Sequence, residues 1–143
     1  MTSPHRIRLQ GRWQVIPPGQ KQEELPDERP LPQSWRSLFG EKNGTAIFRR
    51  AFHTPTNLTD RETVLIRVPE QAGQIRCCLL NGAVVLPVPD CPRAFDVSTR
   101  LSSGLNQLEL QIFFNPAEVA EDVGGIWQPV VLEIFSAPFI PVP

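Results

Sequence analysis

The chain has 143 residues, of which 41% are hydrophobic and 20% are charged, and its net charge is −1. This length suits one domain, and the hydrophobic share excludes a disordered chain. With this small net charge, the chain lacks the excess of basic residues that favours binding to nucleic acid or to an anionic membrane. No stretch has the roughly 18 apolar residues that cross a membrane, and the first residues lack the apolar core of a signal peptide. We therefore predict one domain over residues 1–143, in the cytoplasm, with no nucleic-acid or membrane partner.

In chain order, the first feature is a polar, proline-containing stretch at residues 17–30, which predicts a surface loop. Beyond it, apolar and polar residues alternate in short runs, which is the pattern of half-buried β-strands. We expect strands at residues 46–53, 63–68, 75–80, 83–86, 107–114 and 126–134. No window of helical length shows a clean 3.6-residue apolar period, so the chain is predicted to be all-β.

Turn residues separate these strands. Asn81-Gly82 is a strong hairpin signal because both residues tolerate a positive φ. Residues 98–104 predict a single helical turn that ends at Gly104. Three prolines in residues 137–143 predict a tail or an edge extension, because proline has no N–H to donate. Short strands joined by such turns are typical of an antiparallel sandwich or barrel.

The three cysteines, Cys77, Cys78 and Cys91, form an odd set in a chain without an export signal, which predicts free thiols. The adjacent pair should point to opposite faces of a strand, so the two thiols cannot converge on one metal ion. Neither His5 nor His53 accompanies a nucleophile motif. We therefore predict no catalytic residue, no metal site and no cofactor.

Six short motifs follow one another in the order that is typical of the sugar-binding domain of family 2 glycoside hydrolases. They are Leu9-Gln-Gly-Arg-Trp13, Leu31-Pro-Gln-Ser-Trp35, Ile47-Phe-Arg-Arg-Ala-Phe52, Leu80-Asn-Gly82, Ala94-Phe-Asp-Val-Ser98 with Leu101, Gly104 and Asn106, and Gly124-Gly-Ile-Trp-Gln-Pro-Val130. The chain thus resembles that domain. The resemblance implies an antiparallel jelly-roll β-sandwich that is galactose-binding-domain-like.

In that family the domain precedes an immunoglobulin-like domain and a catalytic (β/α)₈ barrel. Such a barrel needs about 250 residues. In retaining glycosidases two carboxyl groups flank the scissile bond, and in the family both belong to the barrel. The resemblance therefore implies a non-catalytic module here. Residues 84–91 also depart from the family, which has a Gly-x-His segment after the hairpin.

The candidate ligand-binding residues are Asn115, Glu118, Asp122 and Trp127. The resemblance implies that a polar side chain of this loop reaches the substrate, and Asn115 is the best match. An Asx-type turn before Pro116 is the alternative role for Asn115. The carboxylates could hold Ca²⁺, but they are too few for its six to eight oxygen ligands, so a solvated face is the simpler interpretation.

Each tryptophan can either stack on a sugar ring or fill the core. Trp13 and Trp35 lie in strand-like motifs and are expected in the core, whereas both roles stay open for Trp127, which follows a glycine pair. Arg50 has inward parity, and a buried guanidinium needs a partner. We expect Arg50 to form a structural ion pair with Asp96 or to lie at a bulge, and we expect Asp96 to cap the turn that follows it.

Three functions remain open. The first is a non-catalytic carbohydrate-binding module, which the resemblance favours. The second is a protein-interaction or scaffold domain derived from such a module. An independent glycoside-processing enzyme is least favoured, because no nucleophile and base occur together in a motif. The candidate partners are accordingly a carbohydrate or a protein.

Overall fold

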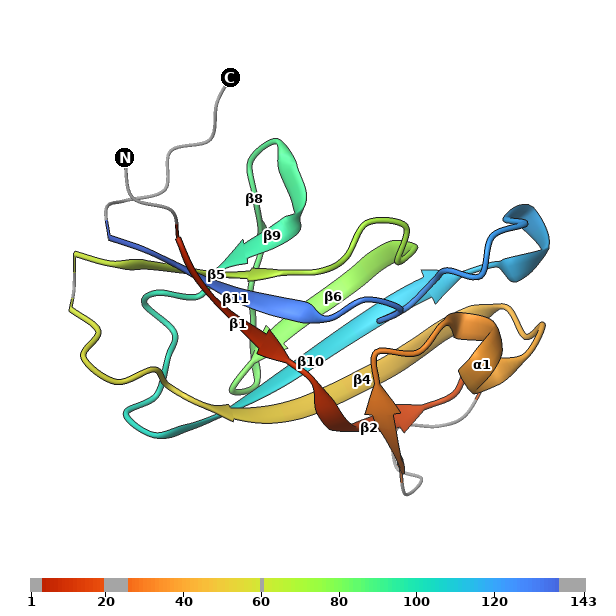
Figure 1. The fold of residues 1–143 in the computed structure, drawn as a ribbon, viewed down its shortest axis with the longest axis horizontal. Helices are drawn as coiled ribbons and strands as arrows, with labels where there is room; N and C mark the ends of the chain where they lie inside the picture. The colour runs from red at the N-terminus through yellow and green to blue at the C-terminus, as the bar shows by residue number, and fades with distance from the viewer. Residues whose placement is uncertain (1–3, 20–25, 60, 137–143) are drawn as a thin grey trace.

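The computed structural model describes residues 4–19, 26–59 and 61–136, and these residues form mainly β-strands (Figure 1). One sheet consists of β1 (His5–Leu9), β5 (Thr63–Arg67), β8 (Pro87–Val88), β9 (Cys91–Asp96) and β11 (Val130–Phe135). The other consists of β2 (Gly11–Ile16), β3 (Asp27–Leu31), β4 (Gly44–His53), β6 (Gln74–Leu80), β7 (Ala83–Val84) and β10 (Leu105–Phe114). The described residues also form two short helices, α1 (Trp35–Phe39) and the 3₁₀ helix η1 (Pro116–Glu118).

The two sheets face each other as a sandwich. The five-stranded sheet has the order β1-β11-β5-β9-β8, and the six-stranded sheet has the order β3-β2-β4-β10-β6-β7. Neighbouring strands in both sheets are antiparallel. The prediction of an all-β jelly-roll sandwich is confirmed.

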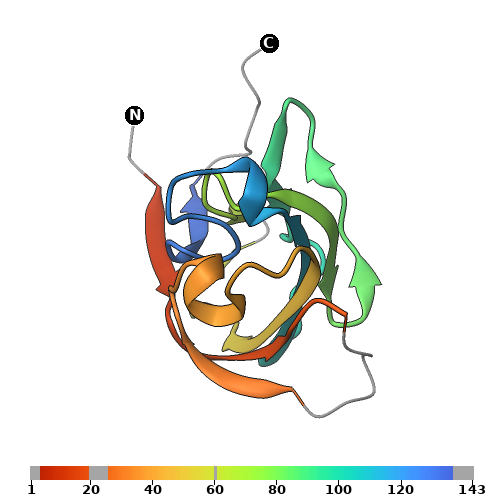
Figure 2. The same cartoon turned by 90° about the vertical axis from the view of Figure 1, so that its right-hand side faces the viewer.

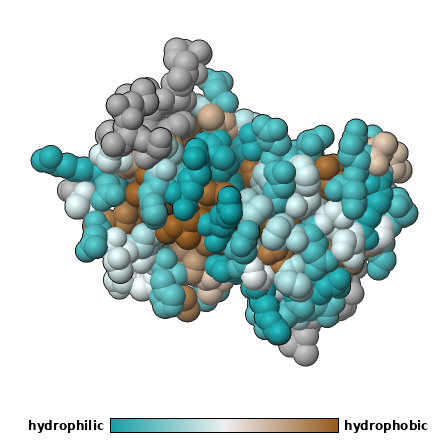
Figure 3. All heavy atoms as spheres, in the orientation of Figure 1, coloured by the Kyte–Doolittle hydropathy of each residue, from teal (hydrophilic) through white to brown (hydrophobic). Residues whose placement is uncertain are grey.

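The core lies between the sheets and follows the predicted alternation. In β10 the inward side chains Leu108, Leu110 and Ile112 are at most 1% exposed, and each such side chain stabilises the fold by about 1.5–3 kcal/mol. Val130 and Leu132 of β11 are buried in the same core from the opposite sheet. Hydrophilic residues cover most of the side shown in Figure 3, with a hydrophobic area over β11 and β1.

Trp13 and Trp35 are both fully buried, as predicted. Trp35 nevertheless begins α1 and does not lie in a strand. Ser34 caps this helix, because its side-chain oxygen accepts a hydrogen bond from Ser37 N–H at 3.2 Å. Figure 2 shows α1 and the segment between β10 and β11 covering one end of the sandwich. No helix in the described part of the chain is long and apolar enough to span a membrane.

The prediction of a surface loop at residues 17–30 is wrong for residues 27–30. Asp27–Leu31 form β3, which pairs with β2 from Gly11↔Leu31 to Val15↔Asp27. A polar strand with a proline is tolerated here because β3 is at the edge of its sheet. Residues 20–25 and the predicted tail at residues 137–143 lie outside the described residues.

Two further elements differ from the prediction. Residues 98–104 contain a hydrogen-bonded turn, with Arg100 N–H bonded to Val97 O at 2.9 Å, but no helix. The strand expected at residues 126–134 begins only at Val130. Ile126 is buried before the strand begins, because Gly124 and Gly125 have positive φ values and turn the chain there.

Two asparagines from the sequence motifs hold neighbouring turns together. Buried Asn106 accepts hydrogen bonds from Ser102 N–H at 2.8 Å and from the Asn81 amide at 3.1 Å. Its own amide donates to Thr54 Oγ1 at 2.8 Å. Asn81 has a φ of 53° in the hairpin, as predicted, and its side-chain oxygen accepts from Gln107 N–H at 2.8 Å. Both residues therefore have structural roles in the described fold.

Candidate functional site

A hollow of about 440 Å³ lies where β10 ends. Two segments that are distant in the sequence form its wall. Its lining residues are Gln71, Gly73, Gln74, Phe113, Phe114, Asn115, Glu118, Val119 and Val123. The hollow therefore combines an apolar wall with three side-chain amides and one carboxylate.

Phe113 and Phe114 reach the hollow from opposite faces of β10, because successive strand residues point to opposite sides. Phe114 is 5% exposed and belongs to the core, whereas Phe113 is only half-buried. The Arg76 guanidinium lies over the Phe113 ring, 5.1 Å from its centroid, which is the geometry of a cation–π contact. The ring of Phe113 is thus held in place at the surface.

Gly73 allows the segment before β6 to approach the backbone of β10. Its φ is +115°, and a Cβ atom at this position would lie 2.2 Å from Phe113 O. No other residue fits that space, since real Cβ atoms do not approach a carbonyl oxygen so closely. This contact places the amides of Gln71 and Gln74 beside the end of β10.

Asn115 lines the hollow and also caps η1. Its side-chain oxygen accepts a hydrogen bond from Ala117 N–H at 3.1 Å, so the Asx-type turn considered for this residue is confirmed. Within the described residues no acceptor is bonded to its side-chain amide N–H groups. Glu118, three residues later, is exposed and lines the same hollow.

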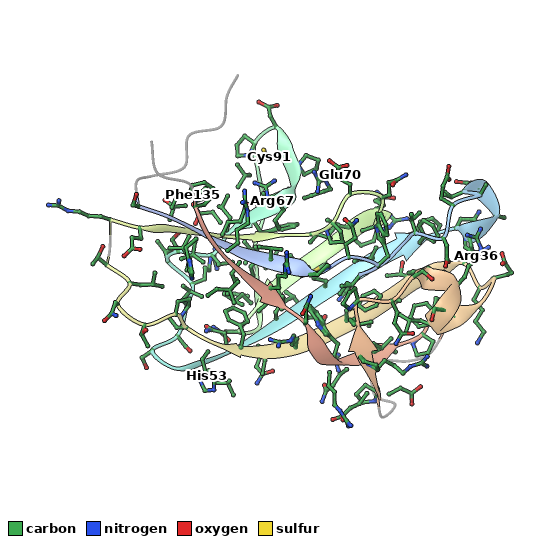
Figure 4. All side chains as sticks on the ribbon, in the orientation of Figure 1. Arg36, His53, Arg67, Glu70, Cys91 and Phe135 are labelled. Carbon is green, nitrogen blue, oxygen red and sulfur yellow. The ribbon has the colours of Figure 1, made fainter. Side chains whose placement is uncertain are left out.

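Arg36 of α1 holds the loop that carries Asn115 and Glu118. Its guanidinium donates to the backbone oxygens of Pro116 and Val119, both at 2.5 Å, and to that of Glu121 at 2.7 Å. Figure 4 shows Arg36 at this end of the sandwich. The loop conformation therefore depends on a side chain about 80 residues earlier in the sequence.

The structure brings together Asn115 and Glu118 but not the other two candidate residues. Asp122 is exposed and is not part of the wall of the hollow. Trp127 is half-buried against the core, and its ring N–H donates to Glu70 O at 2.6 Å. Part of the Trp127 side chain thus packs against the core, as one of its two roles requires, and stacking of its exposed part on a sugar stays a prediction.

The predicted ion pair between Arg50 and Asp96 is not formed. Arg50 donates to Gln10 O through Nε at 3.2 Å and Nη2 at 2.6 Å, where the chain passes from β1 in one sheet to β2 in the other. Burial lowers the pKa of the Arg50 guanidinium from its ordinary value. Asp96 instead accepts from Ser98 N–H at 3.0 Å and Ser98 Oγ at 2.7 Å, so its predicted capping role is confirmed.

The cysteines are free, as predicted, and the strand points Cys78 inward and Cys77 outward. Burial, with a smaller contribution from neighbouring Cys77, raises the pKa of the Cys78 thiol to about 12. This thiol is therefore neutral and unreactive at pH 7. Within residues 4–19, 26–59 and 61–136, no three His, Cys, Asp or Glu side chains are grouped so that they could hold a metal ion.

A buried carboxylate lies on the outer face of the five-stranded sheet. Glu133 is 4% exposed. It accepts from Arg6 Nε at 2.9 Å and from Arg67 Nε at 2.7 Å. Burial alone would raise the pKa of Glu133, but the hydrogen bonds and charges of Arg67 and Arg6 outweigh it and lower the pKa from its ordinary value.

This pKa shift predicts a loss of stability in acid. In the unfolded chain a Glu side chain has a pKa of about 4.3. The stabilisation by Glu133 is therefore complete above that pH, and it is lost as the pH falls through the lower pKa of Glu133 in the folded state. Glu133→Gln should lower the free energy of unfolding by about 1–3 kcal/mol at pH 7, because it weakens two charge-assisted hydrogen bonds. Urea denaturation should show the difference shrinking below about pH 4.

The control for this measurement is Glu28→Gln. Glu28 pairs with Arg12 at 3.2 Å on the surface, where the two side chains are 58% and 81% exposed. Such a pair contributes little. A difference between the natural chain and Glu133→Gln that stays constant from pH 7 to pH 3 would contradict the assigned role of Glu133.

Comparison with solved structures finds this fold within much longer enzymes. A β-glucuronidase from an uncultured Clostridium sp. matches 94% of this chain with a TM-score of 0.70 and 16% identity. The β-glucuronidase of Bifidobacterium dentium matches 96% with a TM-score of 0.70 and 16% identity. The rhamnosidase of Novosphingobium sp. PP1Y matches 94% with a TM-score of 0.69 and 16% identity.

This chain spans only 29%, 30% and 16% of those three enzymes, respectively. No protein-family model matches the sequence, and no curated protein matches it. The fold is therefore that of a jelly-roll β-sandwich domain that forms one part of β-glucuronidases and of a rhamnosidase. The fold that the sequence motifs implied is confirmed.

Proposed function

We propose that the protein is a non-catalytic carbohydrate-binding module whose site is the hollow at the end of β10. The observation that carries this proposal is the position of Phe113. It is an aromatic side chain that follows Glu109 and Gln111 on the outward face of β10, and it lines the hollow together with Gln74, Asn115 and Glu118.

The chemistry of this wall suits a sugar ring. A pyranose has an apolar C–H side, which packs against an aromatic ring, and a rim of hydroxyl groups that donate and accept hydrogen bonds. Side-chain amides offer both donors and acceptors. Gln71, Gln74 and Asn115 supply three of them around the hollow. A few convergent polar groups on an apolar wall are typical of small-ligand sites.

The same wall argues for binding without turnover. Glycosidases of both stereochemical classes generally use two carboxyl groups on either side of the scissile bond. Among the described residues, Glu118 is the only carboxylate that lines the hollow. The similarity of the fold to one segment of β-glucuronidases supports a carbohydrate as the ligand.

The test is a titration of the protein with methyl β-glucoside, methyl β-galactoside, rhamnose and glucuronate, each at up to about 10 mM. NMR monitors the backbone resonances of the protein during each titration. At least one sugar should shift the resonances of Gln74, Phe113 and Asn115. Phe113→Ala should weaken that binding about tenfold, because stacking of a sugar on one aromatic ring contributes on the order of 1–2 kcal/mol to the binding free energy. Gln74→Ala, which removes one exposed amide, should weaken it less.

The matched control is Gln107→Ala, because Gln107 is also exposed but lies on β10 outside the hollow. This variant should bind the sugar as the natural chain does. The proposal is wrong if none of the four sugars shifts any resonance, or if the shifts map to another surface. Release of a chromogenic aglycone by the pure protein would instead favour the enzyme alternative.

A further inference from the structure

A second hollow, of about 420 Å³, lies on the outer side of the five-stranded sheet, and it shares no lining residue with the proposed sugar site. Arginines from three different strands, β1, β5 and β9, converge on it. Its lining residues are Arg8, Arg67, Val68, Pro69, Glu70, Arg93, Gln128, Pro129 and Val131. Three guanidinium groups thus face one carboxylate, in a chain whose net charge is −1.

Sheet register explains why these arginines meet. Arg8 pairs with Val131 and Val131 pairs with Arg67, so the two arginines flank the valine on one rung. Neighbouring strands are about 4.8 Å apart, which places the two Cα atoms about 10 Å apart. Figure 4 shows Arg67 and Glu70 on the same upper side of the sheet.

Two of the three guanidinium groups are held in position by the protein. Arg67 donates through Nε to buried Glu133 at 2.7 Å, which leaves both of its Nη groups without a partner among the described residues. Arg93 donates through Nη1 to Val68 O at 2.8 Å. Its contact with Glu70 is 3.3 Å long and involves a carboxylate that is 77% exposed, so an incoming anion can replace it at little cost.

Arg8 completes the set. It is exposed, and among the described residues it forms no ion pair and no side-chain hydrogen bond. A fixed arginine fork matches the two oxygens of a carboxylate, and a preorganised fork loses less entropy on binding. The hollow therefore offers oriented donors to a carboxylate on an aliphatic floor of valine and proline.

We propose that this hollow binds an acidic segment of a partner polypeptide, with two carboxylates separated by one residue. In an extended segment such side chains lie about 7 Å apart on one face, within reach of Arg8 and Arg67. The wall favours a peptide over an acidic sugar, because it has no aromatic ring and only one side-chain amide, Gln128. Aliphatic and proline side chains instead suit the methylene groups of the two acidic side chains.

The test measures binding of a fluorescein-labelled peptide that contains Glu-Val-Glu, by fluorescence anisotropy at 20 mM and 200 mM salt. Arg8→Gln should weaken binding about threefold to fivefold. Arg93→Gln should weaken it similarly, and salt should weaken binding to the natural chain. A peptide with Gln-Val-Gln should bind at least fivefold more weakly, because it lacks the carboxylates.

Arg12→Gln is the matched control, since Arg12 is 81% exposed on the other sheet and its loss changes the net charge equally. It should leave binding unchanged. Equal weakening by Arg8→Gln and Arg12→Gln would mean unspecific charge attraction and would overturn the proposal. Tight binding of trigalacturonate with no binding of the peptide would overturn it in favour of an acidic carbohydrate. Neither result depends on whether the hollow beside Phe113 binds a sugar.

Discussion

Replacement of Trp35 by alanine should lower the free energy of unfolding by about 3–5 kcal/mol. Trp35 is fully buried. Its ring meets Phe39 edge-on, with centroids 4.8 Å apart, and Phe114 at 5.4 Å. Its ring N–H also donates to Lys42 O at 2.7 Å. The variant removes these contacts and leaves a cavity between α1 and the end of the sandwich.

Urea denaturation, monitored by circular dichroism, measures this decrease in the free energy of unfolding. Leu86→Ala is the control, because Leu86 is 77% exposed and exposed substitutions rarely change stability by more than about 0.5 kcal/mol. If Trp35→Ala costs less than about 1 kcal/mol, the tryptophan does not anchor α1 as described.

Gly73→Ala should lower the free energy of unfolding by about 2–4 kcal/mol and should also weaken the sugar binding that we propose. The added Cβ would lie 2.2 Å from Phe113 O, and the φ of +115° is unfavourable for alanine. Backbone strain of this kind typically costs about 1–3 kcal/mol, and relief of the clash must displace β10 or the segment before β6. Either displacement moves Phe113 relative to Gln74 and so changes the wall of the candidate site.

Substitutions at two other glycines separate the cost of the backbone conformation from the cost of the close contact with Phe113 O. Gly82 has a φ of +82° but nothing within 4 Å of an added Cβ, so Gly82→Ala should cost only about 1 kcal/mol from its backbone conformation. Gly104 has neither a positive φ nor a close neighbour, so Gly104→Ala should be nearly neutral. If Gly73→Ala is no more harmful than Gly82→Ala, the close approach to Phe113 is not a constraint.

The strands with regular alternation could be predicted from the sequence, because one face of each strand is buried against the opposite sheet. β10 is the clearest example, with Leu108, Leu110 and Ile112 inward. β3 could not be predicted this way. It is an edge strand of polar residues, and its pairing with β2 depends on tertiary context. Trp35 was placed in a strand-like motif, although the Ser34 cap and Gly40 were local signals for the helix α1.

The candidate site could be predicted only in part. Asn115 and Glu118 lie in one loop, so a single stretch of sequence pointed to both. Gln71 and Gln74 come from another segment, and the pairing of β6 with β10 together with the close approach at Gly73 brings them to the same hollow. Phe113 did leave a signal, because it is an aromatic residue at a position of β10 where the alternation expects a polar one.

The way in which Arg36 holds the loop after β10 has a consequence for redesign. Its acceptors are main-chain carbonyl oxygens of Pro116, Val119 and Glu121, and every residue type supplies such an oxygen. Exposed loop positions such as Ala117 and Glu118 can therefore be randomised while the scaffold keeps its shape. A combinatorial library at these positions would vary the surface of this loop and leave the architecture of the sandwich unchanged.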